Sequence, residues 1–168
     1  MTSALIIDDH PIVLQGCRRV LEDAGIEPVL AASDLVAGYR LYLRHRPDVA
    51  IVDLAIQGKG LGGLELIRRI KSQDAGAHIL VLSMHNDAMI VARSLEAGAS
   101  GYVLKDTSSE ELVKAVQQVS AGLPFLSGEL AVSYKTVVNT SSQLKHKLKV
   151  RTLPQLIRIA VQLLAPPT

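Results

Sequence analysis

Five polar residues follow apolar runs at widely spaced points of the chain, and their types suit chemistry on an anionic group. They are Asp8, Asp9, Asp53, Ser83 and Lys105. Neighbouring carboxylates repel one another unless a cation lies between them, and their hard oxygens favour Mg²⁺ over softer metals. A single Asp at such a position usually only hydrogen-bonds to a loop. Three of them with a lysine and a hydroxyl indicate one pocket that holds a cation and a reactive carboxylate.

Short apolar runs alternate with amphipathic segments, and this alternation predicts how the polar residues come together. The runs predict five buried strands, at residues 4–7, 28–32, 49–54, 78–83 and 101–104. The amphipathic segments predict five helices, at residues 11–24, 34–44, 63–71, 87–97 and 109–120. Short connections through helices require parallel strands that are covered on both faces. We therefore predict an α/β fold with a doubly wound, five-stranded parallel sheet, whose carboxyl edge carries the polar residues.

Four motifs at these strand ends resemble a known family. The stretches IIDDHPIVLQG, VAIVDLAI, ILVLSMHND and AGASGYVLKD are similar to the receiver domain of two-component response regulators, in particular those of the NarL/FixJ subfamily. The resemblance covers roughly residues 3–125. It implies the flavodoxin-like receiver fold, which agrees with the fold predicted from the apolar pattern.

The resemblance implies a role for each residue of the acidic pocket. Asp53 would accept a phosphoryl group from a sensor histidine kinase, and Lys105 would contribute a positive charge beside it. Mg²⁺ would be bound by Asp9, Asp53 and the backbone carbonyl of Ala55, with Asp8 acting through water. Such a domain phosphorylates itself and slowly dephosphorylates itself, and it is not an enzyme that turns over other substrates.

The resemblance also implies a conformational switch. The Ser83 hydroxyl would donate to the bound phosphoryl group and move toward it, and Tyr102 would swing from solvent into the space left behind. An ordinary half-buried aromatic residue is the alternative interpretation of Tyr102. The face at residues 87–120 would then pair with a second copy or contact an output domain, so we expect a homodimer.

Two residues close to the acidic pair in the sequence are expected to have no catalytic role. His10 follows Asp9 directly and is assigned to the start of the first helix, since nothing near it indicates a metal site with nitrogen ligands. Cys17 is the single cysteine and lies in the apolar-periodic stretch PIVLQGCRRVL. We expect it to be a buried, inert thiol.

Composition limits the class of protein and divides the chain into two parts. The 168 residues are 48% hydrophobic and 20% charged, which allows one domain plus a smaller appendage. No apolar run approaches the roughly 20 residues of a membrane span, so we expect a cytoplasmic protein without a membrane partner. Residues 1–128 carry 12 Lys and Arg against 15 Asp and Glu, whereas residues 129–168 carry six against one. The basic second part suggests a different partner, such as nucleic acid.

The C-terminal part resembles the end of a LuxR-type helix-turn-helix. We assign residues 1–122 to the receiver, 123–132 to a linker, and 133–168 to a partial helix-turn-helix with a recognition helix and a closing helix. The family pattern implies phosphate contacts from Lys135, Lys145 and Lys147. It places Val138, Asn139 and Ser142 toward the base edges of DNA.

The helices that normally precede the recognition helix are missing, a deficit of about 40 residues against a complete output module. Natural truncation, an engineered deletion and a segment absent from the sequence are all open explanations. Two functional hypotheses therefore remain. The first is a phosphorylation-gated transcription regulator. The second is a receiver that acts through protein association or dimerisation and whose DNA-binding tail is not functional. A haloacid-dehalogenase-like hydrolase, a third class, requires an acid–base Asp two residues past the nucleophile, where this chain has Ala55.

Overall fold

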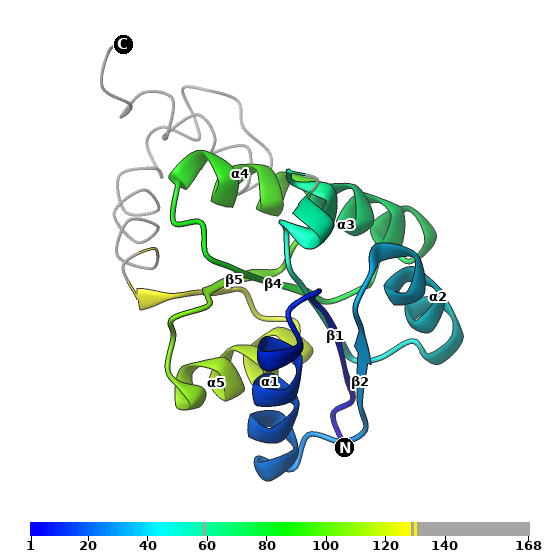
Figure 1. The fold of residues 1–168 in the computed structure, drawn as a ribbon, viewed down its shortest axis with the longest axis vertical. Coiled ribbons are helices and arrows are strands. Elements are labelled where there is room, and N and C mark those ends of the chain that lie inside the picture. Colours follow the sequence, from blue (N-terminus) through cyan, green and yellow to red (C-terminus); the bar gives the residue numbers. More distant parts are fainter. Residues whose placement is uncertain (59, 129, 131–168) are drawn as a thin grey trace.

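Strands and helices alternate along the chain, as the apolar pattern predicts (Figure 1). The computed structural model describes residues 1–58, 60–128 and 130. The strands are β1 (Ala4–Ile7), β2 (Val29–Ala32), β3 (Val49–Val52), β4 (Ile79–Ser83), β5 (Gly101–Leu104) and β6 (Phe125–Leu126). The helices are α1 (Pro11–Asp23), α2 (Leu35–His45), α3 (Gly62–Gln73), α4 (Ala88–Ala97) and α5 (Ser109–Ser120), and a 3-10 turn, η1 (Ile56–Gly58), precedes α3.

The strands form one parallel sheet in the order β2-β1-β3-β4-β5-β6. The chain runs from β1 outward to β2 and then returns to the other side of β1 to form β3, so the strand order reverses between β1 and β3. In sheets of this kind, ligands bind outside the carboxyl ends of the strands at the point of reversal. Asp8 and Asp9 follow β1 and Asp53 follows β3, which brings them to this point.

The predicted α/β fold with a parallel sheet is confirmed, and β6 adds a sixth strand, parallel to β5, to the five that the sequence predicts. It lies within residues 123–132, the range assigned to a linker from the sequence. Two residues are too few to show an alternating or continuous apolar pattern, so the strand had no detectable signal. Ser127 completes this attachment, since its backbone N–H donates to the carbonyl of Tyr102 and its hydroxyl accepts from the N–H of Leu104.

The sheet is covered by helices on both faces (Figure 1), and each face has its own apolar core. Leu5 and Ile7 of β1 point into the core under α2, α3 and α4, and Ile6 points into the core under α1 and α5. All three side chains have no exposed surface. Burying one such side chain contributes about 1.5–3 kcal/mol to stability, which is why parallel strands are apolar along their whole length.

The helices are short, and several begin at residues whose side chains cap the first turn. Asp34 accepts a hydrogen bond from the Ala37 N–H, Asp87 from the Met89 N–H, and Ser108 from the Glu111 N–H. Each such cap contributes about 1 kcal/mol to stability.

Within the part of the chain that the structure describes, no helix combines the length and the apolar character that crossing a membrane requires.

Gly63 anchors the first turn of α3 against the end of β3, and we predict that Gly63→Ala destabilises the fold. A β-carbon there would lie 2.7 Å from the Leu54 Cα and closer still to the Asp53 carbonyl oxygen. Moving backbone atoms apart costs more energy than moving a flexible side chain. We therefore expect the free energy of unfolding, measured in urea, to fall by an amount on the order of 2 kcal/mol. Gly16→Ala is the matched control, because Gly16 lies in α1 with open space around it and should gain up to about 1 kcal/mol. Equal stabilities of the two variants would contradict the role of Gly63.

Candidate functional site

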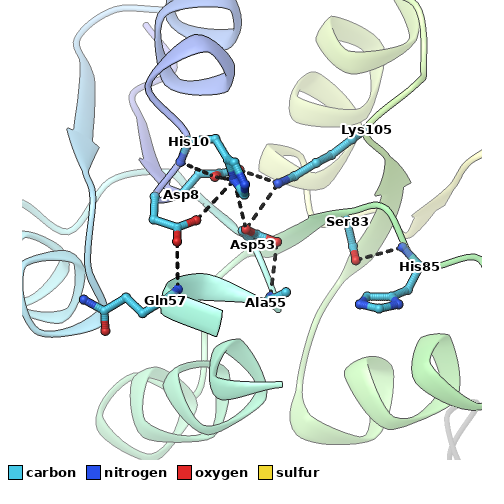
Figure 2. A network of polar contacts seen from close by, with 9 residues as sticks. Asp8, His10, Asp53, Ala55, Gln57, Ser83, His85 and Lys105 are labelled. Atoms are coloured by element: carbon cyan, nitrogen blue, oxygen red, sulfur yellow. Dashed lines mark hydrogen bonds and ion pairs between the residues drawn. The ribbon is translucent and has the colours of Figure 1, made fainter. Parts of the chain in front are cut away.

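Asp53 lies at the base of the pocket, held by the strand that precedes it. Its backbone N–H donates to the Ile7 carbonyl at 2.9 Å, which continues the β1–β3 pairing past the end of the strand. The residue is only 2% exposed. One carboxylate oxygen, Oδ1, accepts from the Ala55 N–H at 3.2 Å, and the other, Oδ2, lies 3.2 Å from the Lys105 ammonium (Figure 2). The carboxylate is therefore fixed in orientation and faces a cation.

The acidic pair after β1 supplies two further carboxylates with different surroundings. Asp8 is 1% exposed, and its Oδ2 lies 2.8 Å from the Lys105 Nζ. Asp9 is partly open to solvent, and its Oδ2 accepts from the Gln57 N–H at 2.9 Å. Gln57 has a positive φ of 62° inside η1, an uncommon conformation for a residue with a side chain. This turn holds Asp9 at the rim of the pocket.

Lys105 reaches the pocket from the end of β5 and pairs with both buried carboxylates. Its backbone N–H donates to the Ser83 carbonyl at 2.9 Å, and its side chain is 9% exposed. Burial opposes the charged ammonium, but the hydrogen bond that it donates to Asp8 and the charges of Asp53 and Asp8 outweigh this effect and raise the pKa of Lys105 above its usual value. The side chain is therefore a permanent positive charge beside Asp53 at neutral pH.

The His10 ring also lies in this cluster, although the sequence indicated no nitrogen ligand beside the acidic pair. Its Nδ1 lies 2.8 Å from Asp8 Oδ1, 3.1 Å from Asp9 Oδ1 and 4.0 Å from Asp53 Oδ2 (Figure 2). The assignment of His10 to the start of the first helix is confirmed, since it is the residue before Pro11 at the N-cap of α1. The backbone turn there directs the ring over the carboxylates, and residue order alone carries no signal for that direction.

The cluster fits a divalent cation. Three buried oxygens have charged or ring partners but no neutral hydrogen-bond donor within the described residues: Asp8 Oδ2 and Asp53 Oδ2 face Lys105, and Asp9 Oδ1 faces His10. One ligand atom from each of Asp8, Asp9, His10 and Asp53 can be chosen so that all four lie within 4.8 Å of one another. Converging carboxylate oxygens of this kind are the ligands that Mg²⁺ prefers.

Ala55 lies beside Asp53 through its N–H, and the contact expected from its carbonyl to Mg²⁺ stays a prediction. Six further residues that the sequence assigned to DNA contacts lie outside the described residues. They are Lys135, Val138, Asn139, Ser142, Lys145 and Lys147.

Ser83 and Tyr102 lie beside the acidic cluster and are linked through the loop after β4. The Ser83 Oγ accepts from the His85 N–H at 3.2 Å (Figure 2), and the Tyr102 hydroxyl donates to the His85 carbonyl at 2.6 Å. Both residues have no exposed surface. Burial raises the pKa of the Tyr102 hydroxyl, and the neighbouring Ser83 hydroxyl opposes that rise. The structure thus holds the Tyr102 ring in a buried position, and its role in a switch stays a prediction.

A cavity of about 250 Å³ opens between α1 and α5. Cys17 and Lys105 both line it. Burial, followed by the charge of Asp8, raises the pKa of the Cys17 thiol to about 11, and the Lys105 charge only partly opposes this. At pH 8 about one thiol in a thousand is then ionised, so we predict alkylation by iodoacetamide far slower than that of free cysteine. Urea should restore the normal rate. Fast alkylation of the native chain would contradict the raised pKa.

Comparison with known proteins identifies the family. Residues 4–117 match the family described as "Response regulator receiver domain". The chain is 33% identical over 128 residues to the methanol utilization control regulatory protein MoxX of Paracoccus denitrificans, covering 76% of this chain and 57% of that protein. It is 33% identical over 132 residues to the response regulator UvrY of Escherichia coli K12, covering 78% of this chain and 60% of that protein. The chain thus matches less than two thirds of the length of these relatives.

Solved structures agree with the sequence comparison. A LuxR-family two-component response regulator from Aurantimonas sp. SI85-9A1 superposes with a TM-score of 0.72 at 39% identity, covering 78% of this chain and 94% of that one. The isolated receiver domain of RcsB from Salmonella enterica serovar Typhimurium, with the phosphomimetic BeF3-, gives 0.69 at 32% identity over 77% and 96% of the two chains. The chain therefore belongs to the response regulator receiver family, with the flavodoxin-like fold of that family and relatives of the NarL/FixJ type.

Proposed function

We propose that this receiver is a phosphorylation-gated regulator: Asp53 accepts a phosphoryl group from a sensor histidine kinase, and the phosphorylated chain controls transcription through DNA binding. The proposal includes Mg²⁺ in the acidic cluster, a homodimer as the active form and a cytoplasmic location. Apart from taking up and slowly losing this phosphoryl group, the domain turns over no substrate.

The observation that carries the proposal is the arrangement of charges around Asp53. One of its oxygens is fixed by the Ala55 N–H, and the other faces Lys105 at 3.2 Å. On the opposite side lie the carboxylates of Asp8 and Asp9, which can hold a cation. A phosphoryl group that arrives between these groups meets positive charge on both sides, and the negative charge on its oxygens is balanced.

The transfer step follows from this geometry. A carboxylate oxygen of Asp53 attacks the phosphorus of the kinase's phosphohistidine, the phosphorus–nitrogen bond breaks, and its electron pair returns to the imidazole, which takes a proton from solvent. Asp9, Asp53 and the Ala55 carbonyl, with Asp8 through water, would hold Mg²⁺, which would neutralise charge that develops on the phosphoryl oxygens. Lys105 binds a second phosphoryl oxygen, and burial of Asp53 limits access of the water that would hydrolyse the acyl phosphate.

The link to the output rests on Ser83 and Tyr102. The Ser83 hydroxyl is proposed to turn from the His85 N–H toward the phosphoryl group, which changes the loop whose carbonyl holds the Tyr102 hydroxyl. Because β5 carries Tyr102 and also binds β6 and Ser127, a shift of β5 would reach the residues that lead into the C-terminal part. Two conformations of this region then differ in energy according to phosphorylation.

The DNA-binding output is proposed from the basic composition of residues 129–168 and the helix-turn-helix resemblance. The alternative is a receiver that acts through association with another protein. A mobility shift on DNA whose midpoint depends steeply on salt would support the first, because phosphate contacts release counterions. A phosphorylated 168-residue chain that binds no DNA but changes its oligomeric state would favour the alternative.

Incubation with acetyl phosphate and Mg²⁺ tests the phosphoryl transfer. The intact mass should increase by one phosphoryl group, and treatment with hydroxylamine should remove it, because an acyl phosphate is cleaved by that nucleophile whereas a phosphoserine is not. EDTA is expected to suppress the reaction, since the carboxylates then lose their cation. A stable phosphoserine or phosphothreonine, or incorporation that is unaffected by EDTA, would contradict the proposed chemistry.

A further inference from the structure

The His10 ring lies where a ligand of the cation would lie. Nδ1 contacts carboxylate oxygens of two Asp residues, at 2.8 and 3.1 Å, and lies 4.0 Å from a third, Asp53 Oδ2 (Figure 2). An octahedral ion with bonds of about 2.1 Å holds neighbouring ligands about 3 Å apart and opposite ligands about 4.2 Å apart. The separations between Nδ1 and the three oxygens match these two values. Metal binding would replace the proton that Nδ1 shares with Asp8 Oδ1.

The backbone fixes this orientation. The His10 N–H donates to Asp8 Oδ1 at 2.9 Å, so main chain and ring of the same residue hold one carboxylate between them. Pro11 follows as the first residue of α1, and its ring restricts the turn that brings His10 over the pocket. The His10 side chain is 60% exposed. A metal bound through Nδ1 therefore leaves Nε2 free to donate to water.

Deeply placed oxygens supply the second, independent indication of a ligand. Among the residues described, Asp8 Oδ2 and Asp53 Oδ2 have charged partners but no neutral hydrogen-bond donor, although Asp8 and Asp53 are only 1% and 2% exposed. The Lys105 Nζ lies 2.8 Å from Asp8 Oδ2 and 3.2 Å from Asp53 Oδ2, and its side chain approaches from the side of β5. His10 approaches from the side of α1. One ligand atom from each of the three Asp residues and one nitrogen of His10 lie within 4.8 Å of one another.

We propose that His10 Nδ1 is a direct ligand of the cation and that it shifts the preference of the site from Mg²⁺ toward borderline first-row ions such as Mn²⁺ and Co²⁺. Mg²⁺ favours an all-oxygen shell, whereas imidazole nitrogen suits transition metals, whose affinity rises along the Irving–Williams series. This inference rests on the proposed function, since it requires that the acidic cluster binds a cation.

Metal binding to the untagged full chain tests the inference. With Mn²⁺ bound, electron spin-echo spectroscopy should detect a ¹⁴N coupling in the native chain and none in His10→Ala. Calorimetric titration should show that His10→Ala weakens Co²⁺ binding about tenfold or more and leaves Mg²⁺ binding within about threefold. Loss of a residue that only hydrogen-bonds to a metal ligand already weakens metal binding by about tenfold, so loss of a ligand should have at least this effect. His45→Ala is the control, because His45 is exposed at the end of α2, and it should retain both the coupling and the affinities.

The outcomes separate this inference from the function on which it rests. A chain that binds Mg²⁺ and Mn²⁺ without a ¹⁴N coupling, and with the same Co²⁺ to Mg²⁺ ratio in His10→Ala, overturns the role of His10 and leaves the phosphoryl transfer intact. A chain that binds none of these ions overturns both. Circular dichroism of His10→Ala confirms that the variant is folded, which its exposed position leads us to expect.

Discussion

Asp53→Asn should abolish the incorporation of a phosphoryl group from acetyl phosphate and Mg²⁺. The amide keeps the size of the side chain and can still accept the Ala55 N–H, so the local structure should persist. It lacks the anionic oxygen that attacks phosphorus. Intact mass spectrometry after a fixed incubation is the measurement, and the expected signal from the variant is none.

Asp106→Asn is the matched control for this prediction. Asp106 follows Lys105 directly but is exposed, so its loss removes the same charge without touching the pocket. Incorporation should stay at the native level. Phosphoryl transfer to Asp53→Asn at a rate close to that of the native chain would show that another residue is the acceptor, and the assignment of Asp53 would then fail.

Lys105→Met should destabilise the metal-free fold strongly and make its stability depend on Mg²⁺. Removal of the ammonium leaves Asp8 and Asp53 buried without the cation that pairs with both. Breaking a buried ion pair in this way costs about 3–5 kcal/mol. A bound divalent ion stabilises the folded state according to its concentration and affinity, and it would supply the missing charge. Urea unfolding with and without Mg²⁺ should therefore show a larger stabilisation by Mg²⁺ in the variant than in the native chain.

Lys114→Met provides the comparison, since Lys114 lies on the exposed side of α5 and its replacement should change stability by less than about 0.5 kcal/mol. The variant at Lys105 should also take up phosphoryl groups slowly, because one of the two positive charges at the phosphoryl oxygens is absent. A loss of stability below about 1 kcal/mol would mean that the buried carboxylates of Asp8 and Asp53 do not depend on the Lys105 charge.

The acidic pocket was predictable because parallel strands bring their carboxyl ends to one edge of the sheet. Apolar runs end at Asp8, Asp53, Ser83 and Lys105, and this pattern is local and easily read. Once the runs are taken as neighbouring parallel strands, the residues after them must converge, whatever the intervening helices contain. The predicted meeting of Asp8, Asp9, Asp53 and Lys105 is confirmed by the structure.

Other features of the site and the sheet were not predictable, because they depend on where a group points and not on the type of residue. Gln57 binds Asp9 through a backbone N–H, which every residue except proline has. Its positive φ cannot be predicted from its residue type. His10 acts through a ring whose direction depends on the N-cap of α1. β6 forms because β5 presents an open edge, and two residues suffice to pair with it. Each of these features comes from three-dimensional neighbours that lie far away in sequence or from local backbone angles.

The sequence by itself determined the order of strands and helices, the parallel sheet and the identity of the carboxylates, lysine and hydroxyl at its edge. These follow from apolar periodicity and from the chirality and short connections of β–α–β units, which are local properties. Only the tertiary structure decided that His10 joins the carboxylates, that Tyr102 is buried against the His85 loop, and that the chain after α5 pairs with β5. Those contacts depend on side-chain direction and on distances of a few ångströms between separate elements, which residue types and spacing do not specify.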